Sequence, residues 1–216
     1  MRVVPVINCS DEACLRARWK QSGEIGAQEV HLDISDGIFS PAVTACTPDL
    51  LRELLKENPN LQVEVHLMVQ NPGSVVDSWI RAGAKKVIVH IEAVRDAQLP
   101  EDRIRALGAG LVLGIAMNTD IKELASCLQN HPVQAVHLLE VPIGPSGGVM
   151  NPGALDRIRF VRTISSGVTI SVDGGITDET ARRVKEAGAD RVVSSSFIWN
   201  SASPKEAYEL LLKIGS

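Results

Sequence analysis

Apolar and polar positions alternate along the chain in eight blocks. Each block opens with a short, nearly continuous run of β-branched and aliphatic residues, which is typical of strands covered on both faces. The regular return of these runs predicts a mainly parallel sheet. The eight predicted strands are Arg2–Asn8, Glu29–Ile34, Gln62–Met68, Lys86–Ile91, Leu111–Met117, Ala135–Leu139, Val168–Val172 and Arg191–Ser195.

An amphipathic segment with apolar residues at helical spacing follows each run. Several of these segments open with proline or aspartate, which are common in the first turn of a helix. Gly-Ala pairs beginning at Gly26, Gly83, Gly108 and Gly188 follow four of the blocks, where a left-handed glycine returns the chain to the next strand. The predicted helices are Asp11–Ser22, Pro48–Asn58, Pro72–Ala82, Pro100–Leu107, Asp120–Gln129, Asn151–Ile164, Asp178–Ala187 and Pro204–Ile214.

Eight strand–helix alternations fit either a closed (β/α)₈ TIM barrel or an open doubly wound sheet. The open sheet normally has a glycine-rich turn after its first strand, and the segment Asn8–Asp11 contains no glycine. We therefore expect an α/β protein of the TIM-barrel type. No linker or shift in composition divides the chain, so residues 1–216 are interpreted as one domain.

Charge and composition narrow the classes of partner. The net charge is −4, no basic run occurs and aromatic residues make up only 3% of the chain, so a nucleic-acid partner has no support. No apolar stretch approaches the roughly 20 residues that span a bilayer, and the N-terminus does not resemble a signal peptide. Cys9, Cys14, Cys46 and Cys127 show no paired zinc spacing and are expected to be reduced thiols of a cytoplasmic protein.

Ionisable residues gather at the predicted strand ends, where TIM barrels carry their active sites. His31 and Asp33 are two residues apart and share one strand face. His66 and Asp173 lie near the ends of two other strands. Two imidazoles and two carboxylates suit one divalent transition metal, with Zn²⁺ expected first and Fe²⁺, Mn²⁺ or Co²⁺ as alternatives.

Four motifs give these residues a context. They are His31-Leu32-Asp33-Ile34-Ser35-Asp36-Gly37, Val65-His66-Leu67-Met68, Val89-His90-Ile91-Glu92-Ala93 and Val172-Asp173-Gly174-Gly175-Ile176. In this order they resemble the motifs of the ribulose-phosphate 3-epimerase family, and the resemblance extends over essentially the whole chain. It implies a barrel of the ribulose-phosphate-binding type.

The resemblance also implies roles for individual residues. The implied metal ligands are His31, Asp33, His66 and Asp173, and the two aspartates are the implied acid and base on opposite faces of the sugar. The substrate is expected to contact Asn8 and Met68. The implied phosphate-binding turns contain Gly147, Gly148, Gly174, Gly175, Ser195 and Ser196.

The implied reaction is epimerisation at C3 of a ketose phosphate, such as D-ribulose 5-phosphate to D-xylulose 5-phosphate. One carboxylate removes a proton and a second returns one from the other side, while a cation stabilises the enediolate. The protein would then be an isomerase of pentose phosphate metabolism, and a homo-oligomer, as is common in that family.

Some positions depart from the family pattern near the expected substrate. Asn8 replaces a serine, and Ser35 replaces a methionine. Ser40–Val43 differs from the usual Val-Pro-Asn segment. The loop Pro142–Val149 is one residue longer than usual and ends in valine instead of glutamine. The metal and acid/base residues are intact, so another pentulose, hexulose or tetrulose phosphate is open as the substrate.

Two other functions stay open. Related decarboxylase and lyase barrels use an Asp-x-Lys-x-x-Asp motif, and the corresponding segment His31–Asp36 has no lysine. A non-catalytic sugar-phosphate sensor would explain the altered loop, but not two intact aspartates. The remaining polar residues near the strand ends are interpreted as structural: His90, His131 and His137 as satisfied polar groups, Asp36 as a loop cap, and Glu92 and Glu140 as salt-bridge partners. Two alternatives stay open: His90 could support a metal ligand, and Glu92 or Glu140 could contact the substrate.

Overall fold

The computed structural model describes residues 1–94, 99–131, 133–144 and 147–216, and these ranges contain eight strands. The strands are β1 (Arg2–Ile7), β2 (Glu29–Ser35), β3 (Gln62–Met68), β4 (Lys86–His90), β5 (Gly110–Ala116), β6 (Ala135–Leu139), β7 (Thr169–Asp173) and β8 (Arg191–Ser194). They follow one another in sequence order in a closed barrel, and the described pairings are parallel. The predicted (β/α)₈ barrel is confirmed.

The helices alternate with the strands, as the periodicity predicts. They are α1 (Glu12–Glu24), α2 (Pro48–Glu57), α3 (Pro72–Ala82), η1 (Ile91–Ala93), α4 (Glu101–Ala106), α5 (Ile121–Asn130), α6 (Ala154–Ile164), α7 (Asp178–Ala187), α8 (Ser196–Trp199) and α9 (Pro204–Gly215). Asp11 and Asp120, which were predicted to begin helices, instead cap them: each carboxylate accepts a backbone N–H of the first turn.

The chain forms two compact units, each described by itself. One is Pro5–Leu111, and the other comprises Met1–Val4 and Val112–Ser216, so the boundaries fall within β1 and near the start of β5. The interpretation of residues 1–216 as one domain stays a prediction.

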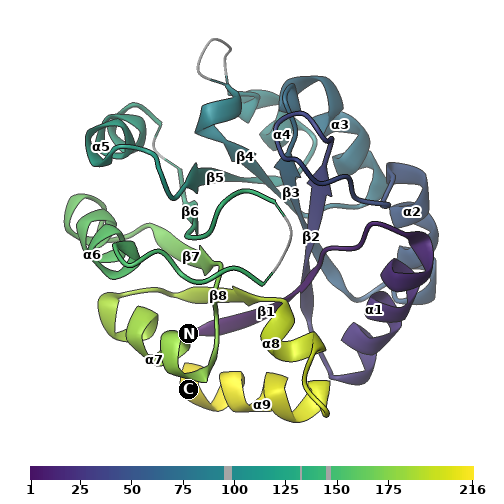
Figure 1. The fold of residues 1–216 in the computed structure, drawn as a ribbon. Helices are drawn as coiled ribbons and strands as arrows, with labels where there is room; N and C mark the ends of the chain where they lie inside the picture. Colours follow the sequence, from purple (N-terminus) through teal and green to yellow (C-terminus); the bar gives the residue numbers. More distant parts are fainter. Residues whose placement is uncertain (95–98, 132, 145–146) are drawn as a thin grey trace. The chain divides into compact units, whose positions relative to one another are not determined.

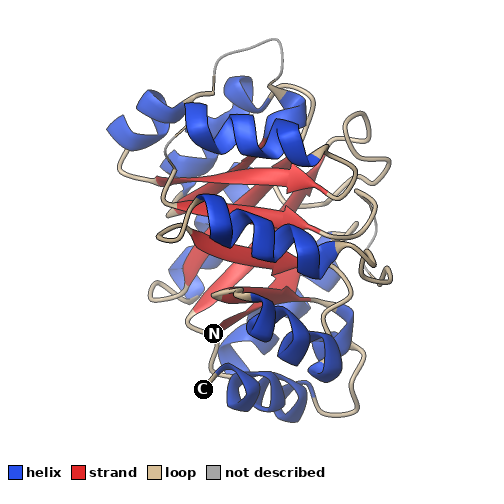
Figure 2. Cartoon of the chain, turned by 90° about the vertical axis from the view of Figure 1, so that its left-hand side faces the viewer, coloured by secondary structure: helices blue, strands red, loops and turns tan. Residues whose placement is uncertain are grey.

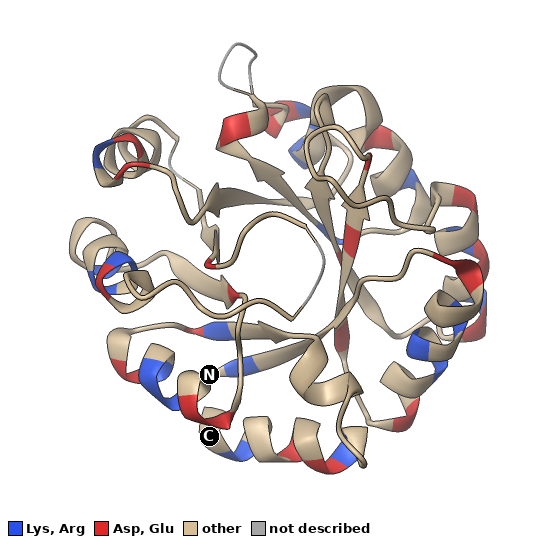
Figure 3. Cartoon of the chain, in the orientation of Figure 1, with Lys and Arg blue, Asp and Glu red and all other residues tan. Residues whose placement is uncertain are grey.

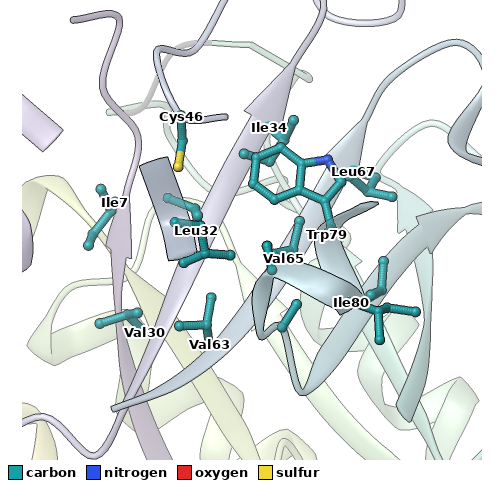
Figure 4. Close-up of a cluster of buried hydrophobic side chains, with 14 of the residues drawn as sticks. Ile7, Val30, Leu32, Ile34, Cys46, Val63, Val65, Leu67, Trp79 and Ile80 are labelled. Carbon is teal, nitrogen blue, oxygen red and sulfur yellow. The ribbon is translucent and has the colours of Figure 1, made fainter. Parts of the chain in front are cut away.

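In the unit Pro5–Leu111, one face of the strands forms a hydrophobic core with α1, α2 and α3 (Figure 1). Figure 4 shows Leu32 of β2, Val65 of β3 and Trp79 of α3 within this cluster, and each is less than 5% exposed. Successive strand residues point to opposite faces. The positions between these apolar residues are therefore left for the other face, and they include the histidines and acids of the candidate site.

In the other unit, helices cover the strands β6, β7 and β8 (Figure 2). Ile158 and Val161 of α6, Val184 of α7 and Leu211 of α9 are fully buried. The predicted glycine turns are confirmed in both units, since Gly26, Gly83, Gly108 and Gly188 all have positive φ values. These turns fix where each new strand starts, and so where each strand end places its polar residues.

Charged residues lie mainly on the helices, with both signs interspersed (Figure 3). Pairs such as Arg16 with Glu12 join neighbouring turns of one helix. In the described ranges, no helix is both long and apolar enough to cross a bilayer.

Candidate functional site

The register of β2 and β3 brings four polar side chains together. His31 lies opposite Glu64, and Asp33 lies opposite His66. One residue separates the two members of the block on each strand. All four side chains therefore share the face opposite the hydrophobic core. The two histidines and Glu64 are fully buried, and Asp33 is 6% exposed. Such a buried block of charged and polar groups in an otherwise apolar sheet indicates a functional site.

Three atoms of this block form a nearly equilateral triangle. His31 Nε2 lies 3.0 Å from Asp33 Oδ1 and 3.1 Å from His66 Nδ1, and the third side, His66 Nδ1 to Asp33 Oδ1, is 3.0 Å. Around a metal with bonds of about 2.1 Å, neighbouring ligand atoms stand about 3.0 Å apart in an octahedron and about 3.4 Å apart in a tetrahedron. The triangle therefore fits one face of a coordination shell, and its donor types suit a divalent transition metal.

The atoms on the outer side of this triangle also have partners. Glu64 Oε1 lies 2.9 Å from His31 Nδ1, and Asn8 Nδ2 donates to Asp33 Oδ2 at 2.8 Å. Metal-binding histidines commonly place their second ring nitrogen against a carboxylate, which fixes the tautomer and the ring orientation. When His31 is neutral, as metal binding requires, Glu64 holds the proton on Nδ1, and the Nε2 lone pair then faces Asp33 and His66.

Electrostatics couple the members of this block. Burial opposes the charged form of His31, but the hydrogen bonds and charges of Asp33 and Glu64 outweigh it and raise the pKa of His31 to about 10. Burial likewise opposes the charge of Asp33, yet His31 and His66 hold the pKa of that carboxyl well below its usual range. Asp33 is thus ionised at neutral pH and is available as a metal ligand or a base.

Two further side chains extend the block toward β4. His90 is the last residue of β4, and its Nε2 lies 2.7 Å from His66 Nε2. The other nitrogen of His90, Nδ1, lies 3.0 Å from Glu92 Oε2. His66 therefore has a buried partner on each side of its ring.

The other unit places Asp173 beside a histidine. Asp173 ends β7, and its Oδ2 lies 3.5 Å from Nε2 of His137, which is fully buried on β6. Of the four predicted metal ligands, the structure brings His31, Asp33 and His66 together in one unit, and Asp173 belongs to the other. Asp173 and His137 form a second imidazole–carboxylate pair at the carboxyl end of the neighbouring strands.

The glycines predicted to bind phosphate have conformations that favour glycine. Gly174 and Gly175 have φ values of 103° and 67°. A Cβ on Gly175 would lie 2.4 Å from the backbone nitrogen of Met150, and one on Gly174 would lie 2.7 Å from the side chain of Val141. The turn after β7 therefore packs directly against the loop after β6, and neither position has room for a side chain.

The remaining predicted phosphate-binding residues lie in neighbouring loops of the same unit. Gly147 and Gly148 are exposed, and Gly147 has a φ of 101°. Ser195 is the N-cap residue of α8 and Ser196 is its first residue. Pro145 and Ser146 of the predicted loop Pro142–Val149 lie outside the described residues.

A buried ion pair supports the loop after β6. Arg157 of α6 donates to Glu140 Oε1 at 2.8 Å and also to the carbonyls of Thr119 and Ala116. Glu140 is fully buried, and its other oxygen accepts from Asn151. The predicted salt-bridge role of Glu140 is confirmed, and the pair ties the ends of β5 and β6 to α6.

Comparison with known proteins shows the family of this chain. A profile described as "Ribulose-phosphate 3 epimerase family" matches residues 2–199. The chain belongs to this family. It is 32% identical over 219 residues to the ribulose-phosphate 3-epimerase of Chlamydia muridarum, with 99% of this chain and 94% of that protein covered. It is 29% identical over 218 residues to the Bacillus subtilis enzyme, with 96% of each covered.

Solved structures extend the likeness at the level of fold alone. A 3-hexulose-6-phosphate synthase superposes with a TM-score of 0.75 over 100% of both chains, at 19% identity. A thiamine phosphate pyrophosphorylase from Pyrococcus furiosus gives a TM-score of 0.65, at 16% identity, with 99% of this chain and 95% of that one covered.

The departures from the epimerase-family pattern occupy different environments. Asn8 binds Asp33, as described above. Ser35 is 5% exposed, and among the described residues its hydroxyl has no hydrogen-bond partner. Met68 is buried opposite Ser35 in the register of β2 and β3. Val149, at the end of the altered loop, is 90% exposed. Ser35 and Met68 therefore follow the predicted metal ligands along this strand face, whereas Val149 is a surface residue.

Several contacts of the candidate site were not predicted from the sequence. Glu64 was given no role, although its separation of two residues from His66 indicates a shared strand face. His90 was interpreted as a satisfied polar residue that could also support the site, and its two ring nitrogens do have partners, one of them on the predicted ligand His66. His137 was interpreted only as a satisfied polar residue, and its Nε2 lies 3.5 Å from the predicted ligand Asp173. The structural role of Asp36 is confirmed, because its carboxylate accepts the backbone N–H groups of Ile38, Phe39 and Gln70.

The prediction of four reduced thiols is wrong for two of them. Cys9 and Cys14 form a disulfide, with their Cα atoms 5.8 Å apart. Cys9 follows β1 and Cys14 lies in the first turn of α1, where Asp11 caps the helix and turns the chain back. This separation lies within the range that a disulfide bridges. The spacing of the cysteines along the chain gave no sign of the turn between them.

Proposed function

We propose that this chain catalyses metal-dependent epimerisation at C3 of a ketose phosphate, with D-ribulose 5-phosphate and D-xylulose 5-phosphate as the first pair to test. The observation that carries the proposal is the triangle of His31 Nε2, Asp33 Oδ1 and His66 Nδ1. A binding module for sugar phosphates needs only contacts to the sugar and the phosphate, whereas this buried triangle combines two imidazoles with an ionised carboxylate.

The proposed metal ligands are His31, Asp33, His66 and Asp173, with Zn²⁺ as the first candidate ion. His137 is a further candidate, because its Nε2 lies 3.5 Å from Asp173 Oδ2 within the same unit. A bound divalent cation supplies Lewis-acid stabilisation of negative charge that develops on substrate oxygens. That the bound ion is Zn²⁺ is itself part of the proposal.

Asp33 and Asp173 are the proposed catalytic residues. In one direction, a carboxylate removes the C3 proton from one face, and the opposing carboxylic acid then delivers a proton to the other face of the planar enediolate. The low pKa of Asp33 keeps it in the ionised form that a general base requires. Asn8 holds Oδ2 of Asp33 and thereby fixes the carboxylate plane.

The turns after β6, β7 and β8 are the proposed phosphate site. Positive φ values and close backbone packing at Gly174 and Gly175 hold this turn in one conformation. Backbone N–H groups in such turns can bind an anion without a charged side chain. Ser195 and Ser196 add the start of α8, where the first N–H groups of a helix have no acceptor within the helix.

The cellular location and the oligomeric state of the protein are also proposals. We propose a cytoplasmic location, for which the support is a rice relative named the cytoplasmic isoform of ribulose-phosphate 3-epimerase, 30% identical over 214 residues. A homo-oligomeric state rests on the family resemblance alone.

Proton exchange at C3 tests the proposed reaction. Purified protein loaded with Zn²⁺ is incubated in D₂O with D-ribulose 5-phosphate and, in parallel, with other pentulose, hexulose and tetrulose phosphates, while NMR follows the C3–H signal. We expect deuterium at C3 and the epimer as product with one of these substrates, and loss of both on chelation. Binding of a sugar phosphate without exchange of its C3 proton would contradict the epimerase proposal and favour a sugar-phosphate sensor.

A further inference from the structure

Beyond the predicted ligands, His90 at the end of β4 and Glu92 of η1 form a chain of contacts that leads to His66. His90 is fully buried, with its Nε2 2.7 Å from His66 Nε2 and its Nδ1 3.0 Å from Glu92 Oε2. The planes of the two imidazole rings differ by only 22°, and Phe39 packs against His90 with ring centroids 5.6 Å apart. His90 is therefore held between a carboxylate and a proposed metal ligand.

We propose that Glu92 and His90 are positioning residues that fix the tautomer of His66 for metal binding. The proposal rests on the metal site of the proposed function and adds two residues to it. Neither residue is assigned to touch the metal or the substrate. Their effect is transmitted through the Nε2–Nε2 contact between the two rings.

Counting protons along these contacts gives the direction of each hydrogen bond. An ionised carboxylate can only accept, so His90 Nδ1 donates to Glu92. A neutral His90 then has its lone pair on Nε2 and accepts a hydrogen bond from His66 Nε2. A neutral His66 with its proton on Nε2 has a lone pair on Nδ1. That nitrogen is the one that faces His31 and Asp33.

The two histidines of the triangle are thus supported by different means. Glu64 contacts His31 directly, whereas Glu92 acts on His66 through a second imidazole. In both cases the outer ring nitrogen carries the proton and the inner nitrogen is left for the metal. The two histidines present different nitrogens to the triangle, Nε2 of His31 and Nδ1 of His66. Two independent sets of contacts nevertheless place the proton on the outer nitrogen of each ring, which supports the positioning role of Glu92 and His90.

Substitutions at His90 separate positioning from simple packing. In His90→Gln, a side-chain oxygen stands near the place of Nε2 and can still accept from His66, whereas in His90→Asn the polar group stands near the place of Nδ1 and cannot. Loss of such a partner commonly lowers metal affinity by about 10- to 100-fold. We expect this loss in His90→Asn, a smaller loss in His90→Gln, and a loss below about 10-fold in Glu92→Gln, which keeps an acceptor but removes the charge.

The experiment measures Zn²⁺ affinity by competition with a chromophoric chelator, with circular dichroism to confirm that each variant is folded. His131→Gln is the matched control, since His131 is the C-cap residue of α5 in the other unit and is not among the proposed site residues. We expect the order wild type and His131→Gln, then Glu92→Gln, then His90→Gln, then His90→Asn. Ring ¹⁵N NMR of the Zn²⁺-loaded wild type should show His66 protonated on Nε2 and His90 protonated on Nδ1.

The outcomes distinguish this inference from the proposed function. Wild-type protein that binds Zn²⁺, with equal affinity in His90→Gln and His90→Asn, would overturn the positioning role and leave the metal site standing. His66 protonated on Nδ1 in the Zn²⁺-loaded protein would overturn it as well. Wild-type protein that binds no Zn²⁺ would overturn the metal site and the positioning role together.

Discussion

The two compact units carry their candidate functional groups in different ways. In Pro5–Leu111 the site consists of side chains on adjacent strands: His31, Asp33, Glu64 and His66 are buried and contact one another through ring nitrogens and carboxylate oxygens. In the other unit, the proposed phosphate site consists largely of loop backbone, with glycines such as Gly175 packed too closely for a side chain. The side-chain cluster depends on residue chemistry, whereas the proposed phosphate site depends on backbone conformation.

This difference predicts two kinds of sensitivity to substitution. An isosteric change in the side-chain cluster should remove chemistry while preserving the fold. In the loops of the proposed phosphate site, adding a methyl group to a glycine removes no functional group. It should displace the backbone instead. The following substitutions test this contrast.

The largest effect is expected at the proposed catalytic aspartates. Asp33→Asn and Asp173→Asn each remove a group that accepts or donates the C3 proton, so kcat should fall by about 10²- to 10⁴-fold. The measurement is steady-state epimerisation together with C3 exchange in D₂O. Asp36→Asn is the control, because Asp36 caps a loop through backbone N–H groups. A control that loses as much activity as Asp33→Asn, while remaining folded, would contradict the assignment.

Removing the buried charge beside the β6 loop should chiefly reduce stability. Glu140→Gln leaves Arg157 buried without its ionic partner, and we expect the free energy of unfolding to fall by about 3 kcal/mol. Urea denaturation of this variant and of Glu179→Gln provides the comparison, since Glu179 is an exposed partner of Arg183 and its loss should cost less than about 1 kcal/mol. Equal losses would show that the Glu140–Arg157 pair gives no special support to the loops.

A methyl group at Gly175 tests the backbone-built site. Gly175→Ala forces a Cβ against Met150 at a positive φ, with a strain of about 1–3 kcal/mol. We expect a higher KM and weaker inhibition by inorganic phosphate, with a smaller change in kcat. At Gly153 a Cβ meets nothing closer than 3.6 Å, so Gly153→Ala should behave as wild type in the same assays. Matching behaviour of the two variants would count against a backbone-built phosphate site.

The smallest predicted effect is the pH dependence of the metal-free protein. The raised pKa of His31, about 10, means that the folded state binds more protons than the unfolded state between roughly pH 6.5 and 10. The stabilisation from His31 is therefore fully present below about pH 6.5 and is lost as the pH rises toward 10. Urea denaturation of chelated protein from pH 6 to 9 should show this decline, and His31→Gln should flatten it. A wild-type stability that rises over this interval would contradict the coupling.

The alternation of apolar strands and amphipathic helices was enough to predict the fold. Strand bounds such as Gln62–Met68 agree residue for residue, because turn residues flank the apolar run on both sides. The start of α6 was placed too early, at Asn151 instead of Ala154, since Asn151 forms a turn by accepting from the backbone of Gly153. The short helices η1 and α8 were not predicted, because three or four residues show no periodicity.

The site was only partly predictable, for a different reason. The two-residue separation of His31 and Asp33 shows that they share a face, but it does not show which residues of β3 lie opposite them. That depends on the strand register, which pairs His31 with Glu64. The contact between His66 and His90 and the Cys9–Cys14 disulfide likewise depend on three-dimensional positions that sequence spacing does not report.

The most direct test of the metal-binding triangle is anomalous diffraction at the zinc edge from crystals of the Zn²⁺-loaded protein. The predicted result is one strong peak at about 2.0–2.2 Å from His31 Nε2, His66 Nδ1 and a carboxylate oxygen of Asp33. A zinc peak elsewhere, or none at full Zn²⁺ occupancy of the protein in solution, would contradict the metal site on which the proposed reaction depends.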